Sequence, residues 1–413
     1  MTTTEGKRAL KNFKLFAGDK VLWIILATLA MFSILVVYST SAKTGYVPNA
    51  RITATQALIQ QFKYLGFAAI VLIVMHHGSC NFYRRMSLPA FALFLLLTFG
   101  AYLTDKSTNG AARWIFGIQP SEALKVCTVL FLARQLAARQ AVISRLRIVP
   151  SLNPLKWFRD PAQQRIWREG TIPILLPVVL ACGVIFTAHT SSALLVFGIS
   201  MVMMFVGRVK GTELLKIMAL AVAAGALLVS LNLGRTGIAG GRVSEWIDLW
   251  YKDFTTVDVN SLPDTERAMI AIQEGGLFGR GAGRSAMRVQ MTHPECDYAF
   301  AFFIEEYGAL LALVVMVFYL WITVRGIVIF TRCETAFPGL VVLGMVLLIT
   351  LQALLHIMVS VNIMPETGQN LPFVSRGGSS LIFSTAAMAI VLAVSRQNDE
   401  KSHDKPRGQS IVE

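Results

Sequence analysis

Long apolar runs recur along this sequence between residues 20 and 395, and shorter polar stretches separate them. Each run has roughly the 20 residues that an α-helix needs to cross about 30 Å of hydrocarbon. Lipid offers the backbone no hydrogen-bond partners, so runs of this length cross a membrane as helices. With 54% hydrophobic and only 15% charged residues, the chain is predicted to be an all-α polytopic membrane protein, not a soluble enzyme with one anchor.

The apolar runs define ten predicted spans joined by short connections and by one long loop, 234–300. The spans are 20–40, 56–76, 87–103, 120–138, 171–187, 192–206, 214–233, 301–324, 337–360 and 379–395. They form one membrane domain, 20–395, between a polar N-tail, 1–19, and a polar C-tail, 396–413. An even number of spans places both tails on the same side of the membrane.

The distribution of charge orients these spans. A formal net charge of +14 would suggest a nucleic-acid partner in a soluble protein. Here the basic residues lie mostly in the tails and in short loops on one alternating side, with no aromatic-interleaved basic domain, and the positive-inside rule explains that pattern. The sequence therefore predicts a membrane protein with cytoplasmic N- and C-termini, an extracytoplasmic 234–300 loop and no nucleic-acid partner.

Asp297 is a candidate general base. It lies in H-P-E-C-D-Y-A-F-A-F-F, where the long loop re-enters the membrane and water gives way to lipid. Desolvation at such a boundary raises the pKa of a carboxyl group toward the range useful for a base. The alternative is an acid at a helix N-terminus that the helix dipole favours. The local sequence leaves both interpretations open.

The same loop carries several arginines and a glycine-rich stretch. The arginines are Arg235, Arg242, Arg267, Arg280, Arg284 and Arg288. In G-G-L-F-G-R-G-A-G-R-S, residues 275–285, backbone amides and guanidinium groups would cradle a phosphate or pyrophosphate. As a pattern this is weak, because glycine loops at membrane surfaces are common.

A second cluster, N-G-A-A-R-W-I-F-G-I-Q-P-S-E-A-L-K, spans residues 109–125. Pro120 fits the first position of a helix and Glu122 its first turn. Lys125 then lies about one turn into an apolar span, where an ionisable group usually faces a bundle interior and has a function. The alternative is a structural ion pair between Glu122 and Lys125, which are i and i+3.

A third cluster, M-P-E-T-G-Q-N-L-P-F-V-S-R-G-G-S-S, covers residues 364–380 just before the last span. The chain is too irregular here to face lipid, so it is predicted to line a cavity or pack on protein. Arg376, ahead of Gly377 and Gly378, is a candidate anion ligand. The alternative is a tight turn with one exposed arginine.

Other polar groups within or beside the spans have structural interpretations. Glu305 and Glu306 are costly in lipid unless they have partners, and we expect structural or supporting roles for both. His189 and His356 are expected to be hydrogen-bonded packing residues. No cluster of side chains has convincing metal-ligand spacing, so no metal-binding residue is predicted.

Taken together, three of these clusters resemble the SEDS family of ten-span peptidoglycan polymerases, which includes FtsW, RodA and SpoVE. G-A-A-R-W-I…I-Q-P-S-E…K resembles the family's G-[AS]-x-R-W-I…x-Q-P-S-E-x-x-K. G-G-L-F-G-R-G-A-G-R-S…P-E-C-D-Y-A-F-A-F-F-I-E-E-Y-G resembles its glycine-rich loop and P-E-x-x-[ST]-D-F-I-[FY]-A-x-I-x-E-E-x-G. P-E-T-G-Q-N-L-P-F-V-S-R-G-G-S-S is similar to its terminal signature, and the three occur in the family's order over nearly the whole chain.

The resemblance implies an inverting glycosyltransferase that polymerises lipid II, linked to undecaprenyl pyrophosphate, into β-1,4-linked glycan at the outer face of the inner membrane. Asp297 matches the family's catalytic aspartate, while Arg113, Glu122, Lys125 and Glu306 match positions associated with its central cavity. The pyrophosphate ligands are then expected among Lys125, Arg113, Arg267, Arg284 and Arg376, and a divalent cation, Mg²⁺ or Mn²⁺, is an alternative source of positive charge. A class B penicillin-binding protein (FtsI-like) and other divisome proteins are the implied partners.

Within the family, Y-S-T-S at 38–41, the compact size and the basic N-tail favour the FtsW branch, which acts at the division septum, over the RodA branch, which acts in elongation. A lipid II flippase and a non-catalytic divisome scaffold are the alternatives from other classes. A flippase would need charge-lined access from the inner leaflet, whereas the ionisable residues crowd the outer side. Departures from the family pattern are T-A-H-T-S-S at 187–192, which lacks a carboxylate, and Cys296, Tyr298 and Arg376.

Overall fold

The computed structural model describes residues 16–41, 54–104, 118–144, 146, 161–230, 236–251, 262–287, 291 and 296–404. In this part of the chain every predicted span coincides with one helix. These helices are α2 (Lys20–Ser41), α3 (Ala54–His76), α4 (Cys80–Thr104), α5 (Pro120–Ala138), α9 (Ile172–Ala188), α10 (Thr190–Val206), α11 (Gly211–Ser230), α14 (Ala299–Thr331), α15 (Ala336–Ser360) and α16 (Gly378–Asp404). Short helical segments α6 (Gln140–Ile143), α8 (Pro161–Ile166) and η2 (Trp167–Thr171) lie between α5 and α9.

Within the described residues, seven helices are long and apolar enough to cross a membrane. They are α2, α3, α4, α14, α15, α16 and the continuous run that ends in α9. Helix α10 is apolar but has only 17 residues, and α5 and α11 are not among the seven. The polytopic helical fold is confirmed, whereas the count of ten spans stays a prediction.

The surfaces of the outer helices are those of a protein in lipid. One face of α14 exposes Leu313, Leu320 and Ile327. The opposite face of the same helix buries Val315 and Ile322 against neighbouring helices. In water such a row of exposed large apolar side chains would be an aggregation hazard, but in a bilayer it is the lipid contact.

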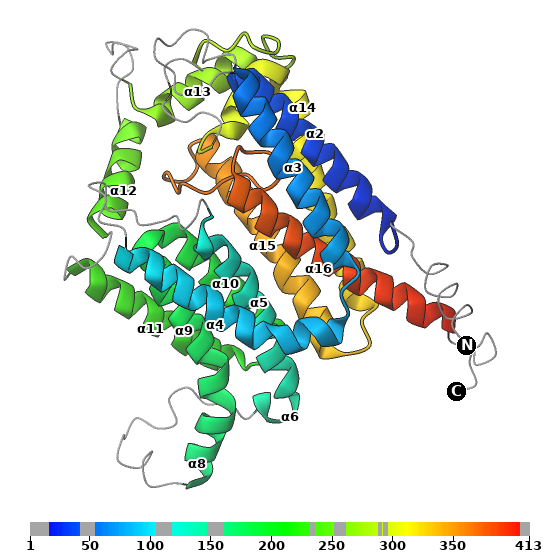
Figure 1. Ribbon diagram of the computed structural model, residues 1–413. Coiled ribbons are helices and arrows are strands. Elements are labelled where there is room, and N and C mark those ends of the chain that lie inside the picture. Colours follow the sequence, from blue (N-terminus) through cyan, green and yellow to red (C-terminus); the bar gives the residue numbers. More distant parts are fainter. Residues whose placement is uncertain are drawn as a thin grey trace.

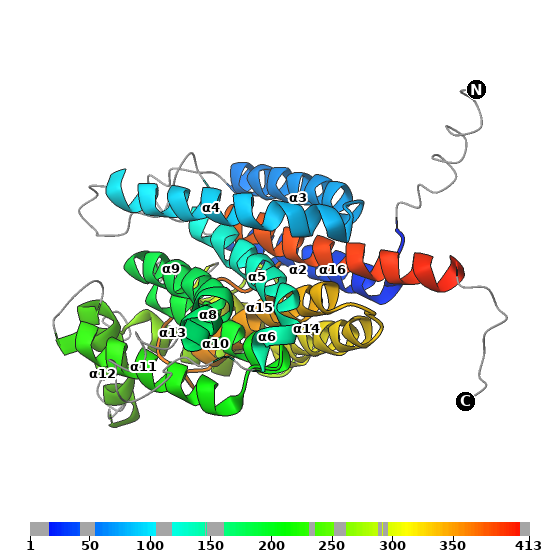
Figure 2. The ribbon, with the colours of Figure 1, turned by 90° about the horizontal axis from the view of Figure 1, so that it is seen from below.

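Helices α5, α15 and α16 form the centre of the bundle. Figure 1 shows α15 between the group α2, α3, α14, α16 and the group α4, α5, α9, α10, α11, and Figure 2 shows the bundle from below. Helix α15 packs on α5, α10, α14 and α16. Helix α5 is buried along almost its whole length, so its polar side chains meet protein and not lipid.

The start of the first span and the end of the last span lie at the same end of the bundle. Asp19, just before α2, accepts a hydrogen bond from Arg325 Nε at 2.8 Å. Arg396, near the end of α16, donates to the carbonyl of His77 at 3.3 Å. This agrees with an even number of spans. We name the opposite end the outer end, following the predicted topology.

In its described residues the long loop 234–300 contains two helices that the sequence pattern did not predict, α12 (Thr236–Tyr251) and α13 (Asp264–Gly275). Helix α13 packs on α14 at the outer end (Figure 1). The start of α13 carries a signal that could have revealed it, because Pro263 precedes Asp264 and Glu266 in the first turn. The loop is therefore partly a helical cap on the bundle.

Candidate functional site

The turn that carries Asp297 is fastened to the α15–α16 connection, which contains the terminal motif. Asp297 is partly exposed at the outer end, two residues before α14 begins. Ser375 Oγ donates to the carbonyl of Cys296 at 3.1 Å. The Cys296 thiol donates to the carbonyl of Arg376 at 3.2 Å. Two motifs that are far apart in the sequence therefore meet beside the predicted base.

The first turn of α14 is held by His356 of α15, whose side chain is completely buried. The backbone amide of Phe300 donates to His356 Nε2 at 3.4 Å, and His356 Nδ1 lies 2.6 Å from the carbonyl of Gln369. Because Nε2 accepts, Nδ1 carries the proton and donates to Gln369. The expectation of a hydrogen-bonded packing histidine is confirmed. Its partner Phe300 is three residues after Asp297 in the sequence, so His356 supports the segment next to the predicted base.

Lys125 is buried, with 1% of its surface exposed, and the i, i+3 ion pair forms as its spacing suggests. Its Nζ lies 2.8 Å from Glu122 Oε1 and donates to Gln352 Oε1 at 3.1 Å. Gln352 Nε2 in turn donates to the carbonyl of Asn370 at 3.0 Å. The lysine is thus linked to the α15–α16 connection through Gln352, and a pyrophosphate would have to displace these contacts to reach it.

Hydroxyl groups from α10 hold the other side of the α15–α16 connection. Gln369 Nε2 donates to Ser192 Oγ at 2.7 Å, and Ser191 Oγ donates to the carbonyl of Thr367 at 2.7 Å. This is the segment where the family often has a carboxylate. The sequence analysis missed Gln352 and Gln369 as site residues, although an amide side chain within an apolar span such as α15 is a signal of internal hydrogen bonding.

Arg376 and the two glycines after it have separable roles. Arg376 is partly exposed, and its Nη2 donates to Gln60 Oε1 at 3.3 Å. A Cβ atom on Gly378 would lie 2.6 Å from the ring of Tyr64, and one on Gly377 would lie 2.9 Å from Asn370 Nδ2. Gly378 allows close packing of α16 on α3, and Gly377 leaves room for the Asn370 side chain. The Arg376 guanidinium, which contacts α3, is a candidate anion ligand.

The expectation that amides of the glycine-rich stretch cradle a phosphate is wrong. The amides of Arg280 and Gly281 donate to the carbonyls of Glu305 and Glu306, both at 2.9 Å. The amide of Gly283 donates to Ser39 Oγ at 3.1 Å. These donors are already used within the protein, because the stretch packs on α14. The Arg284 side chain is exposed and remains a predicted pyrophosphate ligand.

Glu305 and Glu306 are buried, and protein groups donate hydrogen bonds to both carboxylates. Glu305 Oε1 accepts from the amide of Ala286 at 2.7 Å and from that of Met287 at 3.3 Å. Its other oxygen accepts from the Ser285 hydroxyl. Glu306 accepts from the Ser39 hydroxyl at the end of α2. Both oxygens of Glu305 and one oxygen of Glu306 therefore accept from protein donors.

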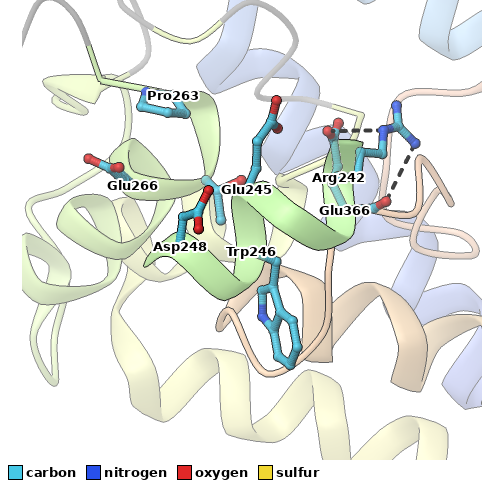
Figure 3. Close-up of a pocket in the computed structure, with 8 residues that line it drawn as sticks. Arg242, Glu245, Trp246, Asp248, Pro263, Glu266 and Glu366 are labelled. Carbon is cyan, nitrogen blue, oxygen red and sulfur yellow. Dashed lines mark hydrogen bonds and ion pairs between the residues drawn. The ribbon is translucent and has the colours of Figure 1, made fainter. Parts of the chain in front are cut away.

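An acidic cavity of about 260 Å³ lies between α12, α13 and the α15–α16 connection (Figure 3). Its lining residues are Arg242, Glu245, Trp246, Asp248, Pro263, Thr265, Glu266 and Glu366. Thr265 Oγ1 lies 2.8 Å from the Tyr298 hydroxyl, so the cavity adjoins the residue after Asp297. Desolvation raises the pKa of Glu366, Arg242 lowers it, and the nearby Asp297 raises it further.

Two further predictions concern Arg267 and Arg113. Arg267 lies on α13, where its Nη1 is 3.2 Å from Asp264 Oδ1, so an acid already balances its charge. Arg113 lies outside the described residues. Within the described residues no group of three or more His, Cys, Asp or Glu side chains could hold a metal ion. The chemistry below is derived from side chains alone.

The fold and the site define a multi-pass helical membrane protein with a carboxylate held at one end of the bundle, beside a re-entrant connection that is anchored to a buried lysine. The family model of the FtsW, RodA and SpoVE cell cycle proteins matches residues 19–400. The chain belongs to this family.

Curated relatives and solved structures agree with this assignment. A probable peptidoglycan glycosyltransferase FtsW of Legionella pneumophila is 26% identical over 353 residues, which cover 83% of this chain and 82% of the relative. One of Pseudomonas fluorescens is 27% identical, covering 80% and 79%. A solved chain of a peptidoglycan synthase complex that coordinates polymerization and crosslinking has a TM-score of 0.68, 20% identity, and covers 92% of this chain and 98% of its own. The rod shape determining protein RodA of Thermus thermophilus has a TM-score of 0.59, 21% identity and the same coverages.

Proposed function

We propose that this protein is a peptidoglycan glycosyltransferase that polymerises lipid II into β-1,4-linked glycan strands. The proposal is supported by the family, by relatives named as probable peptidoglycan glycosyltransferases, and by one structural observation above all. Asp297, which matches the catalytic aspartate of the family, is a partly exposed carboxylate on a turn whose neighbours are fixed by hydrogen bonds to α15 and to the α15–α16 connection. A base must be positioned before it is useful.

In the proposed reaction Asp297 takes the proton from the 4-hydroxyl of the GlcNAc of an incoming lipid II. That oxygen attacks C1 of the MurNAc at the end of a growing chain and forms the new β-1,4 bond with inversion. The bond from C1 to undecaprenyl pyrophosphate breaks, and the electron pair leaves with the pyrophosphate. One base suffices because pyrophosphate is a good leaving group.

The developing charge on pyrophosphate needs a cation. Among the predicted ligands, Arg376 and Arg284 fit this role better than Lys125, because their side chains reach the protein surface. Lys125 is engaged by Glu122 and Gln352, so we assign it the support of the α15–α16 connection. This separation of roles changes the expectation from the sequence, in which Lys125 contacts the leaving group.

We further propose that the protein acts in the inner membrane at the division septum, with both termini in the cytoplasm and with a class B penicillin-binding protein as partner. The two relatives described above carry the name of the division protein FtsW, which supports division over elongation. The flippase and scaffold alternatives need no base at Asp297, and this difference provides the test.

The test is a lipid II polymerisation assay on purified protein, with and without its cognate penicillin-binding protein. Wild type and Asp297→Asn are compared after size exclusion and thermal unfolding show that both are folded. We expect glycan ladders from wild type and a loss of roughly a hundredfold or more in the variant, as for other general bases. Equal ladders from both would keep the enzyme but refute the base, and no ladders from either would favour transport or scaffolding.

A further inference from the structure

Helix α14 is broken at Gly308. This residue has φ 87° and ψ 162° inside an otherwise helical run of 33 residues. That conformation is open to glycine and to essentially no other residue. The break separates a short re-entrant segment, 299–307, which follows Asp297, from a long segment, 309–331.

The glycine-rich loop supplies the hydrogen bonds that the break removes. In an unbroken helix the amides of Ala309 and Leu310 would bond to the carbonyls of Glu305 and Glu306. Instead these carbonyls accept from the loop, through the amides of residues 280 and 281, at 2.9 Å each. The two freed amides donate to the loop carbonyls of residues 276 and 277, at 2.9 and 3.3 Å. The loop thus replaces the helical hydrogen bonds at the break with its own backbone groups, and we name this arrangement the splice.

The fit between loop and break leaves no room for side chains. A Cβ atom on Gly279 would lie 2.2 Å from the carbonyl oxygen of Glu306, and one on Gly308 would lie 2.3 Å from that of Leu277. A Cβ atom on Gly275 would lie 2.2 Å from the carbonyl oxygen of Ile304. Backbone therefore meets backbone along the whole contact, which is how hydrogen bonds can replace those of the helix.

The carboxylate of Glu305 fastens the far end of the same loop. It is completely buried and accepts from the amides of Ala286 and Met287 and from the hydroxyl of Ser285. The carbonyl of Glu305 takes part in the splice itself. One residue of α14 thus holds both ends of the loop segment 280–287, by its backbone and by its side chain.

We propose that Glu305 is a positioning residue for the reaction of Asp297: it keeps the loop spliced into α14, and the break sets where the Asp297 turn lies. This inference rests on the proposed function. Asp297 precedes Gly308 by roughly 16 Å of helix rise, so a change of direction of about 30° at the break would move its carboxylate by roughly 8 Å. A base displaced by even about 1 Å loses around a hundredfold in rate.

The splice also implies what happens when it fails. Without the loop, two carbonyls and two amides at the break have no partners at membrane depth, which is costly. They recover partners when α14 closes into one continuous helix. That closure turns the 297–307 segment and breaks the contact between the Cys296 thiol and the carbonyl of Arg376. Cys296 therefore reports on the position of the Asp297 turn.

The experiment compares four substitutions in protein that retains Cys296 as its only cysteine and polymerises like wild type. Glu305→Ala removes the side-chain anchor, and Gly308→Ala attacks the break independently. Glu305→Gln is the conservative variant, because its amide oxygen can accept from both backbone amides and its nitrogen can donate to Ser285. Gly66→Ala is the matched control, since a Cβ atom there meets nothing within 4 Å.

Two readouts do not depend on activity. Trypsin cleavage after Arg280 and Arg284, whose side chains are exposed, measures release of the loop. The rate at which a water-soluble maleimide labels Cys296 measures movement of the Asp297 turn. We expect both to rise about tenfold in Glu305→Ala and Gly308→Ala, as for a locally opened segment, and to stay near wild type in Glu305→Gln and Gly66→Ala.

The third readout is glycan synthesis, which we expect to fall roughly a hundredfold in the two disrupting variants and to be rescued by Glu305→Gln. A released loop with unchanged Cys296 labelling would overturn the proposal. If wild type makes no glycan while labelling follows the expected pattern, the proposed function fails and the splice stands. If both disrupting variants fail to fold, hydrogen exchange of wild type decides, because fast exchange of the amides of residues 280, 281, 309 and 310 would refute the splice.

Discussion

Removing the charge of Lys125 tests whether this lysine acts through structure or through contact with substrate. Lys125→Met keeps the length of the side chain but leaves Glu122, only 2.8 Å away, as a buried acid without its cation. Breaking one partner of a buried ion pair costs about 3–5 kcal/mol of unfolding free energy. Glu122→Gln is expected to cost a similar amount. The double variant removes both charges. We expect its unfolding free energy to be at least about 2 kcal/mol higher than that of Lys125→Met, which is about half of the loss caused by the single substitution.

The assay is reversible unfolding in mixed micelles by increasing SDS, followed by intrinsic fluorescence, for wild type, both single variants and the double variant. Additive losses in the double variant would refute the ion-pair argument, as would a loss below about 1 kcal/mol for Lys125→Met. Polymerisation per folded molecule then separates the roles. A structural lysine predicts that the double variant regains activity together with stability, whereas a lysine that binds pyrophosphate predicts that activity stays low.

Three further substitutions test the surroundings of the site. His356→Gln places an acceptor near the position of Nε2, toward Phe300, whereas His356→Asn places a donor near the position of Nδ1. We expect the Gln variant to keep more activity than the Asn variant, with an unchanged KM. The opposite order would mean that Phe300 is not the important partner of His356. Glu366→Gln is expected to raise the unfolding temperature at pH 7, because burial raises the pKa of Glu366 and makes its ionised form a cost. The gain must shrink as the pH falls and vanish below about pH 4, where the acid is protonated in both states. Gly378→Ala forces a methyl group against Tyr64 and is expected to destabilise the protein by about 1–3 kcal/mol in the same SDS assay, with Gly66→Ala unchanged.

The sequence could predict features that depend on neighbouring residues, but not contacts between residues far apart in the chain. The helices were predictable because a span needs about 20 apolar residues, which is a local property. The Glu122–Lys125 pair was predictable from its i, i+3 spacing. The third partner of Lys125 was not, because Gln352 is 227 residues away.

The glycine-rich loop was misinterpreted for the same reason. Its composition indicates backbone groups that can approach another chain closely, but it does not say which groups they meet. A phosphate and the free carbonyls at the break in α14 would both need loop amides that can approach them closely. In the structure the amides of Arg280 and Gly281 bond to the carbonyls of Glu305 and Glu306. The local sequence does not reveal this contact, because the two segments are about 25 residues apart.

The turn before α14 takes each of its anchors from a different element. Thr265 on α13 contacts Tyr298, His356 on α15 accepts from Phe300, and the α15–α16 connection contacts Cys296. Such an arrangement fixes Asp297 only while these elements keep their relative positions, because no single neighbour encloses it. The rate of a reaction that depends on Asp297 must therefore respond to displacements of α13 or α15 that leave every span folded. Catalysis is then expected to be more sensitive than stability to substitutions at this end of the bundle.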